Sequence, residues 1–231
     1  MREQRYAVIG VGDFGKAISK ILAEKGAEVL AIDVSESLIN EIKDDVATAV
    51  SLDATDKKAL MSQNIEEFDA VVVAIGENFE ALLLCCVQLQ EIGVKRILAR
   101  VNGKQQRMIL EKMGITEIIS PEYEFGKSVS ERLLNPSVVS YLTLPDNYEI
   151  AELRAPKGVD NRTIDDIGLR TKYNLNLITV KRGYLVEKKG EEVREEHILG
   201  VPTSDTVIYK SDTIVVFGLV SDIEKFIELN K

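Results

Sequence analysis

The strongest fold signal in the sequence is the hexapeptide Gly10-Val11-Gly12-Asp13-Phe14-Gly15. It ends the short apolar run Tyr6-Ala7-Val8-Ile9 and opens a stretch with apolar residues at helical spacing, which predicts a strand, a tight turn and a helix. In a βαβ unit the first glycine of such a GxGxxG pattern permits the turn. The second lets a pyrophosphate approach the backbone, and the third lets helix and strand pack closely. The helix N-terminus behind them offers unpaired N–H groups and a positive dipole end to a phosphate.

The pattern of a strand followed by a helix recurs along the first half of the chain. Further strands are predicted at residues 28–32, 47–50, 69–75, 96–101 and 117–119, with helical patterns between them that often close at a glycine. The run Ala70-Val71-Val72-Val73-Ala74-Ile75 is apolar on both faces, as in a parallel sheet covered on both sides. The predicted fold class is therefore α/β, with a doubly wound, parallel, Rossmann-like sheet.

The second half of the chain has a different texture, which predicts a small α+β domain. Its expected elements are a strand at 149–154, a short helix within 161–173 capped by Thr163, a hairpin of strands 176–181 and 184–188 that turns at Arg182-Gly183, a strand at 213–217 and an amphipathic helix at 221–230. Asn135-Pro136 and Pro145-Asp146-Asn147 are breaking signals. We therefore expect an N-terminal domain at 1–135 that ends in a crossover helix, a linker at 136–147 and a C-terminal domain at 148–231.

Composition excludes several function classes. The 231 residues include 29 Lys and Arg against 38 Asp and Glu, a net charge of −9, which disfavours a nucleic-acid surface. His197 is the only histidine, so a histidine-based triad or a multi-histidine metal site is not expected. The two cysteines, Cys85 and Cys86, are adjacent in an apolar helix, which fits core positions in a reducing cytosol. No run approaches the length of a membrane span, and no signal-peptide core follows Met1.

An acidic residue lies where a ribose would be expected. Asp33 ends the second predicted strand, and a carboxylate there can accept hydrogen bonds from both ribose hydroxyls. It would repel a 2′-phosphate, and Val34-Ser35-Glu36 supplies no arginine to accept one. NADP is therefore disfavoured, whereas NAD, ADP and ATP all remain compatible with the motif.

Further candidates follow the carboxyl ends of other strands, the edge at which α/β sheets bind ligands. Asp53-Ala54-Thr55 follows the third strand, Ile75-Gly76 the fourth, and Arg100 lies near the end of the fifth, where it could meet a phosphate. Each has an alternative structural role. Asp53 could cap the next helix, and Arg100 could pair with a carboxylate on the surface.

Together these segments resemble the RCK (TrkA-N/TrkA-C) regulatory subunits of Trk/Ktr-type potassium uptake systems. The resemblance rests on Ala7-Val8-Ile9-Gly10-Val11-Gly12-Asp13-Phe14-Gly15, Asp33, Asp53-Ala54-Thr55, Val72-Val73-Ala74-Ile75-Gly76-Glu77-Asn78, Leu110-Glu111-Lys112-Met113-Gly114, Ser120-Pro121-Glu122, Leu169-Arg170-Thr171-Lys172-Tyr173 and Ile214-Val215-Val216-Phe217-Gly218. It covers essentially the whole chain, in the domain order of the family.

The resemblance implies a cytoplasmic regulatory subunit rather than an enzyme. Such a subunit is a homo-oligomer whose dimers assemble into a ring, often an octamer, under a membrane potassium-translocating subunit at the inner face of the cell membrane. ATP, ADP or NAD(H) in the N-terminal cleft biases the shape of the ring, and the ring gates the pore. The expected mechanism is a population shift, in which a ligand favours the ring shape that binds it more tightly.

The resemblance also assigns roles to residues. Gly10, Gly12 and Gly15 hold the phosphates and Asp33 the ribose; Asp53, Ala54 and Thr55 line the adenine side; Ile75 and Gly76 border the cleft; and Arg100 faces phosphate. Glu122 matches a carboxylate beside the terminal phosphate that is expected to hold Mg²⁺, although a first-turn acid favoured by the helix dipole is the alternative. Asp13 departs from the family, because Ktr-type members often have an arginine there to meet the terminal phosphate of ATP. Lys16 is one turn away and could compensate, or could be a solvated helix lysine.

Three further functional possibilities follow. In the second domain, Arg170 and Asn176 match positions associated with cyclic di-AMP in some Ktr-type members, with a surface or dimer-interface role as the alternative. A small NAD-dependent oxidoreductase would need a general acid or base near the nicotinamide, and the single histidine lies in the second domain. A DNA repressor would need a helix-turn-helix and a basic face, and both halves of the chain are acidic.

Overall fold

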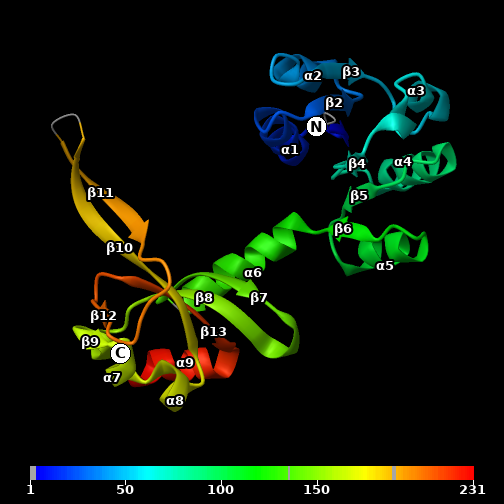
Figure 1. Cartoon of the computed structure of the whole chain (residues 1–231). Helices are drawn as coiled ribbons and strands as arrows, with labels where there is room; N and C mark the ends of the chain where they lie inside the picture. The colour runs from blue at the N-terminus through cyan, green and yellow to red at the C-terminus, as the bar shows by residue number, and fades with distance from the viewer. Residues whose placement is uncertain (1–3, 135, 189–190) are drawn as a thin grey trace. The chain divides into compact units, whose positions relative to one another are not determined.

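Two compact units, Met1–Glu124 and Phe125–Lys231, make up the chain (Figure 1). The computed structural model describes residues 4–134, 136–188 and 191–231. Helix α6 (Pro121–Leu134) contains the boundary between the units. Asn135, the last residue of the first predicted domain, lies outside the described residues.

The first unit is built on a six-stranded parallel sheet, which confirms the predicted α/β fold class. Its strands are β1 (Arg5–Ile9), β2 (Glu28–Asp33), β3 (Thr48–Ser51), β4 (Ala70–Val73), β5 (Ile97–Arg100) and β6 (Glu117–Ile119), in the spatial order β3-β2-β1-β4-β5-β6. The connections contain α1 (Asp13–Glu24), α2 (Glu36–Ile42), α3 (Lys57–Met61), the 3₁₀ turn η1 (Ile65–Glu67), α4 (Phe79–Ile92) and α5 (Lys104–Lys112). Strands β2 and β3 are added on one side of β1, and β4, β5 and β6 on the other side. This switch in strand order places a crevice at the carboxyl ends of β1 and β4.

Alternating side chains of the sheet feed two apolar layers. Val8, Val29 and Val72 pack with Phe14 and Ile18 of α1. The neighbouring positions on the other face, which include Ile9, Ile32 and Val73, pack with Leu82, Cys85 and Leu89 of α4. Helices therefore cover both faces, which explains why the strand sequences are apolar throughout rather than alternating.

The second unit combines an antiparallel sheet with helices, which confirms the expected small α+β domain. The sheet order is β11-β10-β13-β8-β7, formed by β7 (Val138–Thr143), β8 (Tyr148–Arg154), β10 (Asn176–Lys188), β11 (Glu191–Ile198) and β13 (Thr213–Leu219). Smaller elements are η2 (Pro145–Asn147), η3 (Lys157–Val159), β9 (Arg162–Thr163), α7 (Ile164–Ile167), α8 (Leu169–Tyr173), β12 (Val207–Ile208) and α9 (Val220–Leu229). Phe226 of α9 is fully buried and belongs to the same core as Leu153 and Val216.

The segment expected to be a linker, 136–147, contains a strand of this sheet. Strand β7 pairs with β8, with Leu142 opposite Ile150 and Tyr141 opposite Ala151. The breaking signal Pro145-Asp146-Asn147 is the turn that joins the two strands, and both Asp146 and Asn147 have positive φ, at 59° and 61°. Asparagine and aspartate tolerate that conformation better than other side chains.

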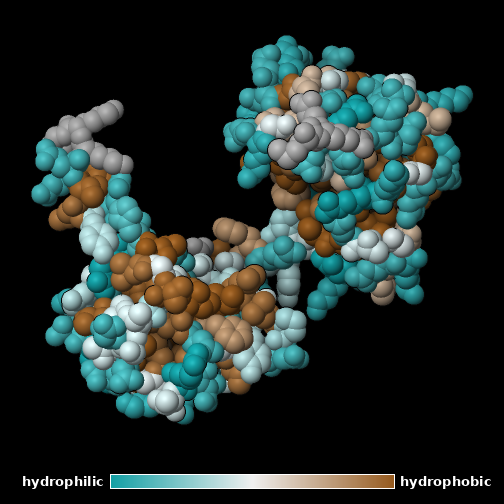
Figure 2. Space-filling view, in the orientation of Figure 1, coloured by the Kyte–Doolittle hydropathy of each residue, from teal (hydrophilic) through white to brown (hydrophobic). Residues whose placement is uncertain are grey.

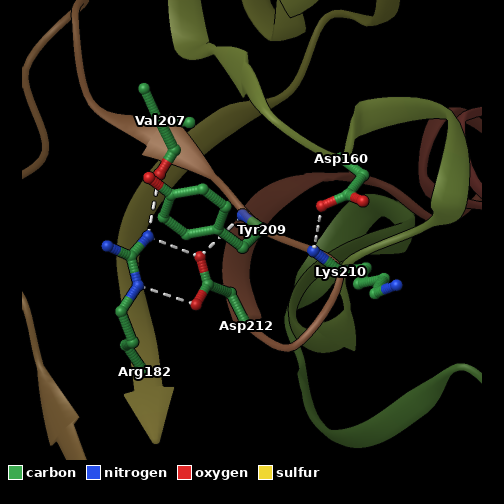
Figure 3. A network of polar contacts seen from close by, with 6 residues as sticks. All are labelled: Asp160, Arg182, Val207, Tyr209, Lys210 and Asp212. Atoms are coloured by element: carbon green, nitrogen blue, oxygen red, sulfur yellow. Dashed lines mark hydrogen bonds and ion pairs between the residues drawn. The ribbon is translucent and has the colours of Figure 1, made fainter. Parts of the chain in front are cut away.

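The prediction of a hairpin turn at Arg182-Gly183 is wrong. Strand β10 runs through both residues, and they pair with His197 and Glu196 of β11. Arg182 is fixed in the strand by a contact that is remote in sequence, because Nε and Nη2 donate to the two carboxylate oxygens of Asp212 at 2.8 and 2.7 Å (Figure 3). Asp212 also accepts from the backbone N–H of Tyr209 at 2.9 Å. Lys181, opposite Thr213, is the last residue of β10 that pairs with β13.

The second unit has a large apolar surface. Figure 2 shows brown side chains gathered over it, and its exposed apolar residues include Leu133, Leu134, Leu142, Leu185, Ile198 and Val201. A contiguous apolar surface of this kind usually marks an interaction site.

Candidate functional site

The glycine turn joins β1 to α1 at the carboxyl edge of the sheet. Gly10 has φ +90°, and a Cβ there would lie 2.9 Å from the backbone carbon of Ala74. A Cβ on Gly15 would lie 1.8 Å from the carbonyl oxygen of Gly10. A Cβ on Gly12 would meet nothing within 4 Å. The turn therefore needs two of its glycines for packing, while Gly12, the N-cap of α1, keeps the backbone open toward the crevice.

Asp33 is held in place by backbone donors. Its Oδ2 accepts from the N–H of Val11 at 2.8 Å, and its Oδ1 accepts from the N–H of Ser35 at 2.9 Å. Each carboxylate oxygen has a further lone pair to offer to a ligand. The end of β2 and the glycine turn thus form one fixed corner.

The predicted residues after β3 line the crevice rather than cap a helix. The cap of α3 is Asp56, whose side chain accepts from the N–H of Lys58. Asp53 Oδ1 instead accepts from the N–H and the hydroxyl of Thr55, at 2.9 and 2.7 Å. These bonds lower the pKa of Asp53, the backbone bond most strongly, so the group is a carboxylate at neutral pH.

Arg100 and Glu122 lie together on the opposite side of the crevice. Arg100 Nη2 and Glu122 Oε1 form an ion pair, so the surface-pairing alternative for Arg100 is present in the structure. The guanidinium also lies over the ring of Phe14, 5.2 Å from its centroid. Glu122 is in the first turn of α6. Its pKa is lowered, first by a backbone hydrogen bond and then by Arg100, while its slight burial acts in the opposite direction.

A cleft of about 1360 Å³ brings most of the predicted residues together. Its lining includes Gly10, Gly12, Asp13, Phe14, Asp33, Asp53, Ala54, Thr55, Ile75, Gly76, Arg100 and Glu122. Val11 and Gly15 are buried behind it and act through packing and through the Val11 N–H. Lys16 is not among the lining residues. It pairs with Glu41, and this hydrogen-bonded contact raises the pKa of Lys16.

The cleft also contains residues that were not predicted as site residues. They include Ile9, Ile32, Val34, Leu38, Leu52, Glu80, Ala81, Leu84, Asn102 and Gln106. Asn102 donates from Nδ2 to the carbonyl of Gly76 at 3.0 Å, and its N–H donates to Gln106 Oε1 at 2.7 Å. Asn102 could have been found from its place two residues after the end of β5, but Gln106 carries no comparable signal.

The charges in the cleft are strongly unequal. Its lining holds the carboxylates of Asp13, Asp33, Asp53, Glu77, Glu80 and Glu122. Arg100 is the only lysine or arginine among the described residues that line it. A phosphate in the cleft therefore depends on Arg100, on backbone N–H groups and on the N-terminus of α1.

The two residues predicted for a second ligand are also in contact. Arg170 of α8 donates from Nε to Asn176 Oδ1 of β10 at 2.9 Å. Across the described part of the chain, no group of three or more metal-ligating side chains gathers, and no helix is long and apolar enough to cross a membrane.

Two family matches divide the chain in the same order as the structure. Residues 6–121 match the TrkA-N domain and residues 149–231 match the TrkA-C domain. This chain belongs to the TrkA-N/TrkA-C family.

Relatives within the TrkA-N/TrkA-C family match over almost the whole length. The chain is 33% identical over 224 residues to the Ktr system potassium uptake protein C of Bacillus subtilis, covering 97% of this chain and 96% of that protein. It is 32% identical to the Ktr system potassium uptake protein A of the same organism, covering 98% and 96%. Both relatives are potassium uptake proteins by name, which agrees with the family expected from the sequence.

Solved structures support the TrkA-N/TrkA-C fold. The GsuK RCK domain matches 99% of this chain with a TM-score of 0.64 at 15% identity, and this chain spans 48% of that one. A GsuK channel bound to NAD matches 99% of this chain with a TM-score of 0.63, also at 15% identity, and this chain spans 39% of it. At that identity the likeness concerns the fold alone.

Proposed function

We propose that the chain is the nucleotide-binding regulatory subunit of a potassium uptake system. The observation that carries the proposal is the cleft beside Gly12, where an open glycine backbone, a helix N-terminus and the fixed Asp33 carboxylate converge. The near full-length similarity to Ktr potassium uptake proteins supplies the biological setting.

The ligand is an adenine nucleotide, ADP or ATP, or NAD(H). Asp33 accepts hydrogen bonds from the ribose, and Asp53, Ala54, Thr55 and Ile75 border the adenine. Gly10, Gly12 and Arg100 receive the phosphates. The cleft volume, about 1360 Å³, exceeds the ~300–1,000 Å³ typical of small-molecule sites and so leaves room for a dinucleotide.

Mg²⁺ enters this proposal only with a nucleotide. Glu122 is paired with Arg100, and the described residues contain no cluster of three ligating side chains. Phosphate oxygens would have to provide most of the ligands, with Asp13 or Glu122 as the protein carboxylate.

The subunit acts by gating a membrane partner. We propose a homo-oligomer, assembled from dimers into an octameric ring, that lies at the inner face of the membrane on a potassium-translocating subunit. Nucleotides favour one ring shape by binding it more tightly than the other. The exposed apolar side chains of the second unit support assembly, since a free surface of this kind is unfavourable in water.

A second ligand, cyclic di-AMP, is proposed for the second unit. Its support is the contact of Arg170 with Asn176, which places a guanidinium and an amide side by side for phosphate recognition. Cyclic di-AMP at saturation should raise the melting temperature of the full chain, and an Arg170→Gln variant should lose that increase. No increase in the unaltered protein would remove this ligand.

Calorimetric titration of nucleotide-stripped protein tests the main proposal. ATP, ADP, NADH and NAD are titrated with and without Mg²⁺, and binding of at least one in the micromolar range is expected. Potassium uptake by vesicles that contain the membrane partner is then measured with and without that nucleotide. Binding without any change in uptake would contradict the regulatory role, and no binding by any of the four would contradict the site.

A further inference from the structure

Arg100 is held in a fixed position on one wall of the cleft. Its side chain is only 20% exposed. It lies over the ring of Phe14, and a Cβ on Gly76 would lie 3.2 Å from its Nη1, so Gly76 and Phe14 confine the guanidinium from two sides. This arginine is therefore prepared to receive a charged partner without reorganising.

The present partner of Arg100 is loosely held and incomplete. Glu122 meets Nη2 through Oε1, but the Glu122 side chain is 59% exposed. Arg100 Nε is buried and has no hydrogen-bond partner among the described residues. A buried donor without an acceptor is unfavourable, and this one lies on a guanidinium that faces a ligand cleft.

We propose that Glu122 occupies the place of a ligand phosphate on Arg100, and that a bound phosphate displaces it. A phosphate along the Nε–Nη2 edge would accept from both donors, as arginine–phosphate pairs commonly do. It would supply the acceptor that Nε lacks and take over the donor that Glu122 uses. The displaced carboxylate is exposed and regains water, so the exchange costs little.

The exchange also links phosphate binding in the cleft to the first turn of helix α6. Glu122 follows Pro121 in the first turn of α6, the helix that contains the boundary between the two units. Occupancy of the cleft by a phosphate thereby changes the ion pairing of this turn. This inference rests on the proposed nucleotide-binding function and adds to it the group with which the nucleotide competes.

The sign of one substitution separates this exchange from a role of Glu122 as a magnesium ligand. Glu122→Gln removes the competing charge and keeps the shape of the side chain. We expect it to tighten ADP and NADH about two- to fivefold in the presence of a chelator, which corresponds to the coupling of an exposed ion pair. A residue that held the ligand through a cation would give weaker binding in Mg²⁺ and no gain in the chelator.

The experiment is calorimetry on the full chain with ADP, NADH and adenosine. Glu77→Gln is the matched control, since it removes one negative charge from the same cleft without touching the ion pair. The exchange predicts that Glu122→Gln exceeds Glu77→Gln in its effect on ADP or NADH. It also predicts no gain for adenosine, which has no phosphate, and no gain in an Arg100→Gln background.

Each outcome has a defined meaning. Unchanged or weaker binding by Glu122→Gln, or a gain no larger than that of Glu77→Gln, would overturn the exchange while leaving nucleotide binding intact. A gain that persists without Arg100 would also overturn it. Failure of the unaltered protein to bind either nucleotide would overturn the proposed function itself, and the exchange with it.

Discussion

Asp33 Oδ2 accepts a hydrogen bond from the backbone N–H of Val11 at 2.8 Å, which ties the end of β2 to the glycine turn after β1. The same carboxylate therefore has a structural duty and a proposed ligand duty. The backbone donors fix its orientation before a ligand arrives, and this preorganisation reduces the entropy lost on binding.

The first prediction concerns this carboxylate. Asp33→Ala should weaken the binding of ADP or NADH about ten- to hundredfold, because hydrogen bonds from ribose hydroxyls to a charged acceptor are lost. Calorimetry measures the change, and NADPH serves as the matched ligand, since its 2′-phosphate should be repelled by the unaltered protein. Equal affinities for NADH and NADPH would show that Asp33 does not face the ribose.

The second prediction separates the two roles of glycine in the turn. Gly12→Ala should leave the free energy of unfolding within about 1 kcal/mol, since a Cβ there meets nothing, yet weaken nucleotide binding roughly tenfold or more. Gly15→Ala should destabilise the first unit by about 3 kcal/mol or more, because its Cβ would collide with the Gly10 carbonyl. Thermal unfolding and calorimetry on both variants check this, and full affinity in Gly12→Ala would place the phosphate elsewhere.

The third prediction concerns Asp13, which is exposed in the first turn of α1 and lines the cleft. Replacing its negative charge with a positive one in Asp13→Arg should raise the affinity for ATP relative to ADP by roughly fivefold or more, because ATP carries the additional charge. Parallel titrations of both proteins with both nucleotides give the two ratios. The same ratio in each protein would mean that residue 13 does not meet the terminal phosphate.

The fourth prediction concerns the ion pair between Arg182 of β10 and Asp212. The Asp212 side chain is fully buried and accepts both from Arg182 and from the Tyr209 N–H (Figure 3). Asp212→Ala should destabilise the second unit by about 2–4 kcal/mol, less than for a wholly buried pair because Arg182 is 21% exposed and can reach water.

Hydrogen exchange on the full chain locates that loss. Faster exchange is expected in β10 and β13, with the strands of the first unit unchanged. Glu224→Ala is the control, because Glu224 is an exposed residue of α9 and its effect should stay within about 0.5 kcal/mol. Equal effects of the two substitutions would contradict a structural role for the buried pair.

The fifth prediction concerns the two thiols of α4. Burial raises the pKa of Cys86 to about 12 and that of Cys85 well above its ordinary value. Neither thiol should react with a disulfide reagent at pH 8 in the folded protein, and both should react in denaturant. Since the folded pKa of Cys86 is the higher one, its contribution to stability is complete below pH ~9 and is lost as the pH rises toward 12. Rapid labelling of the native protein would contradict the burial.

The strands and helices of the first unit could be predicted from the sequence because their signals are local. Strand β4, with Val71, Val72 and Val73, is apolar on both of its faces. Helix α4 ends at Gly93, where φ is +93°. The second unit was harder. Arg182-Gly183 resembles a turn only when read with its neighbours, and the pairing with Asp212 that keeps Arg182 in a strand spans 30 residues.

The candidate site shows the same division. Gly12, Asp33 and Asp53 follow strand ends, a rule that can be applied to the sequence, and the structure places all three in one cleft. The ion pair of Arg100 with Glu122 could not be derived in that way. It depends on how close the end of β5 lies to the start of α6, which pairing of β5 with β6 determines.

The close packing around Gly10 and Gly15 has a consequence for the evolution of related chains. A side chain at residue 15 would collide with the Gly10 carbonyl, and one at residue 10, where φ is positive, would collide with the backbone of Ala74 and Ile75. Substitution at either position is therefore disfavoured whether or not a nucleotide is ever bound. A descendant that had abandoned its ligand would still keep both. Gly12 is under no such restraint, so its replacement, rather than the loss of the whole motif, would be the first visible trace of a lineage that had stopped sensing nucleotides.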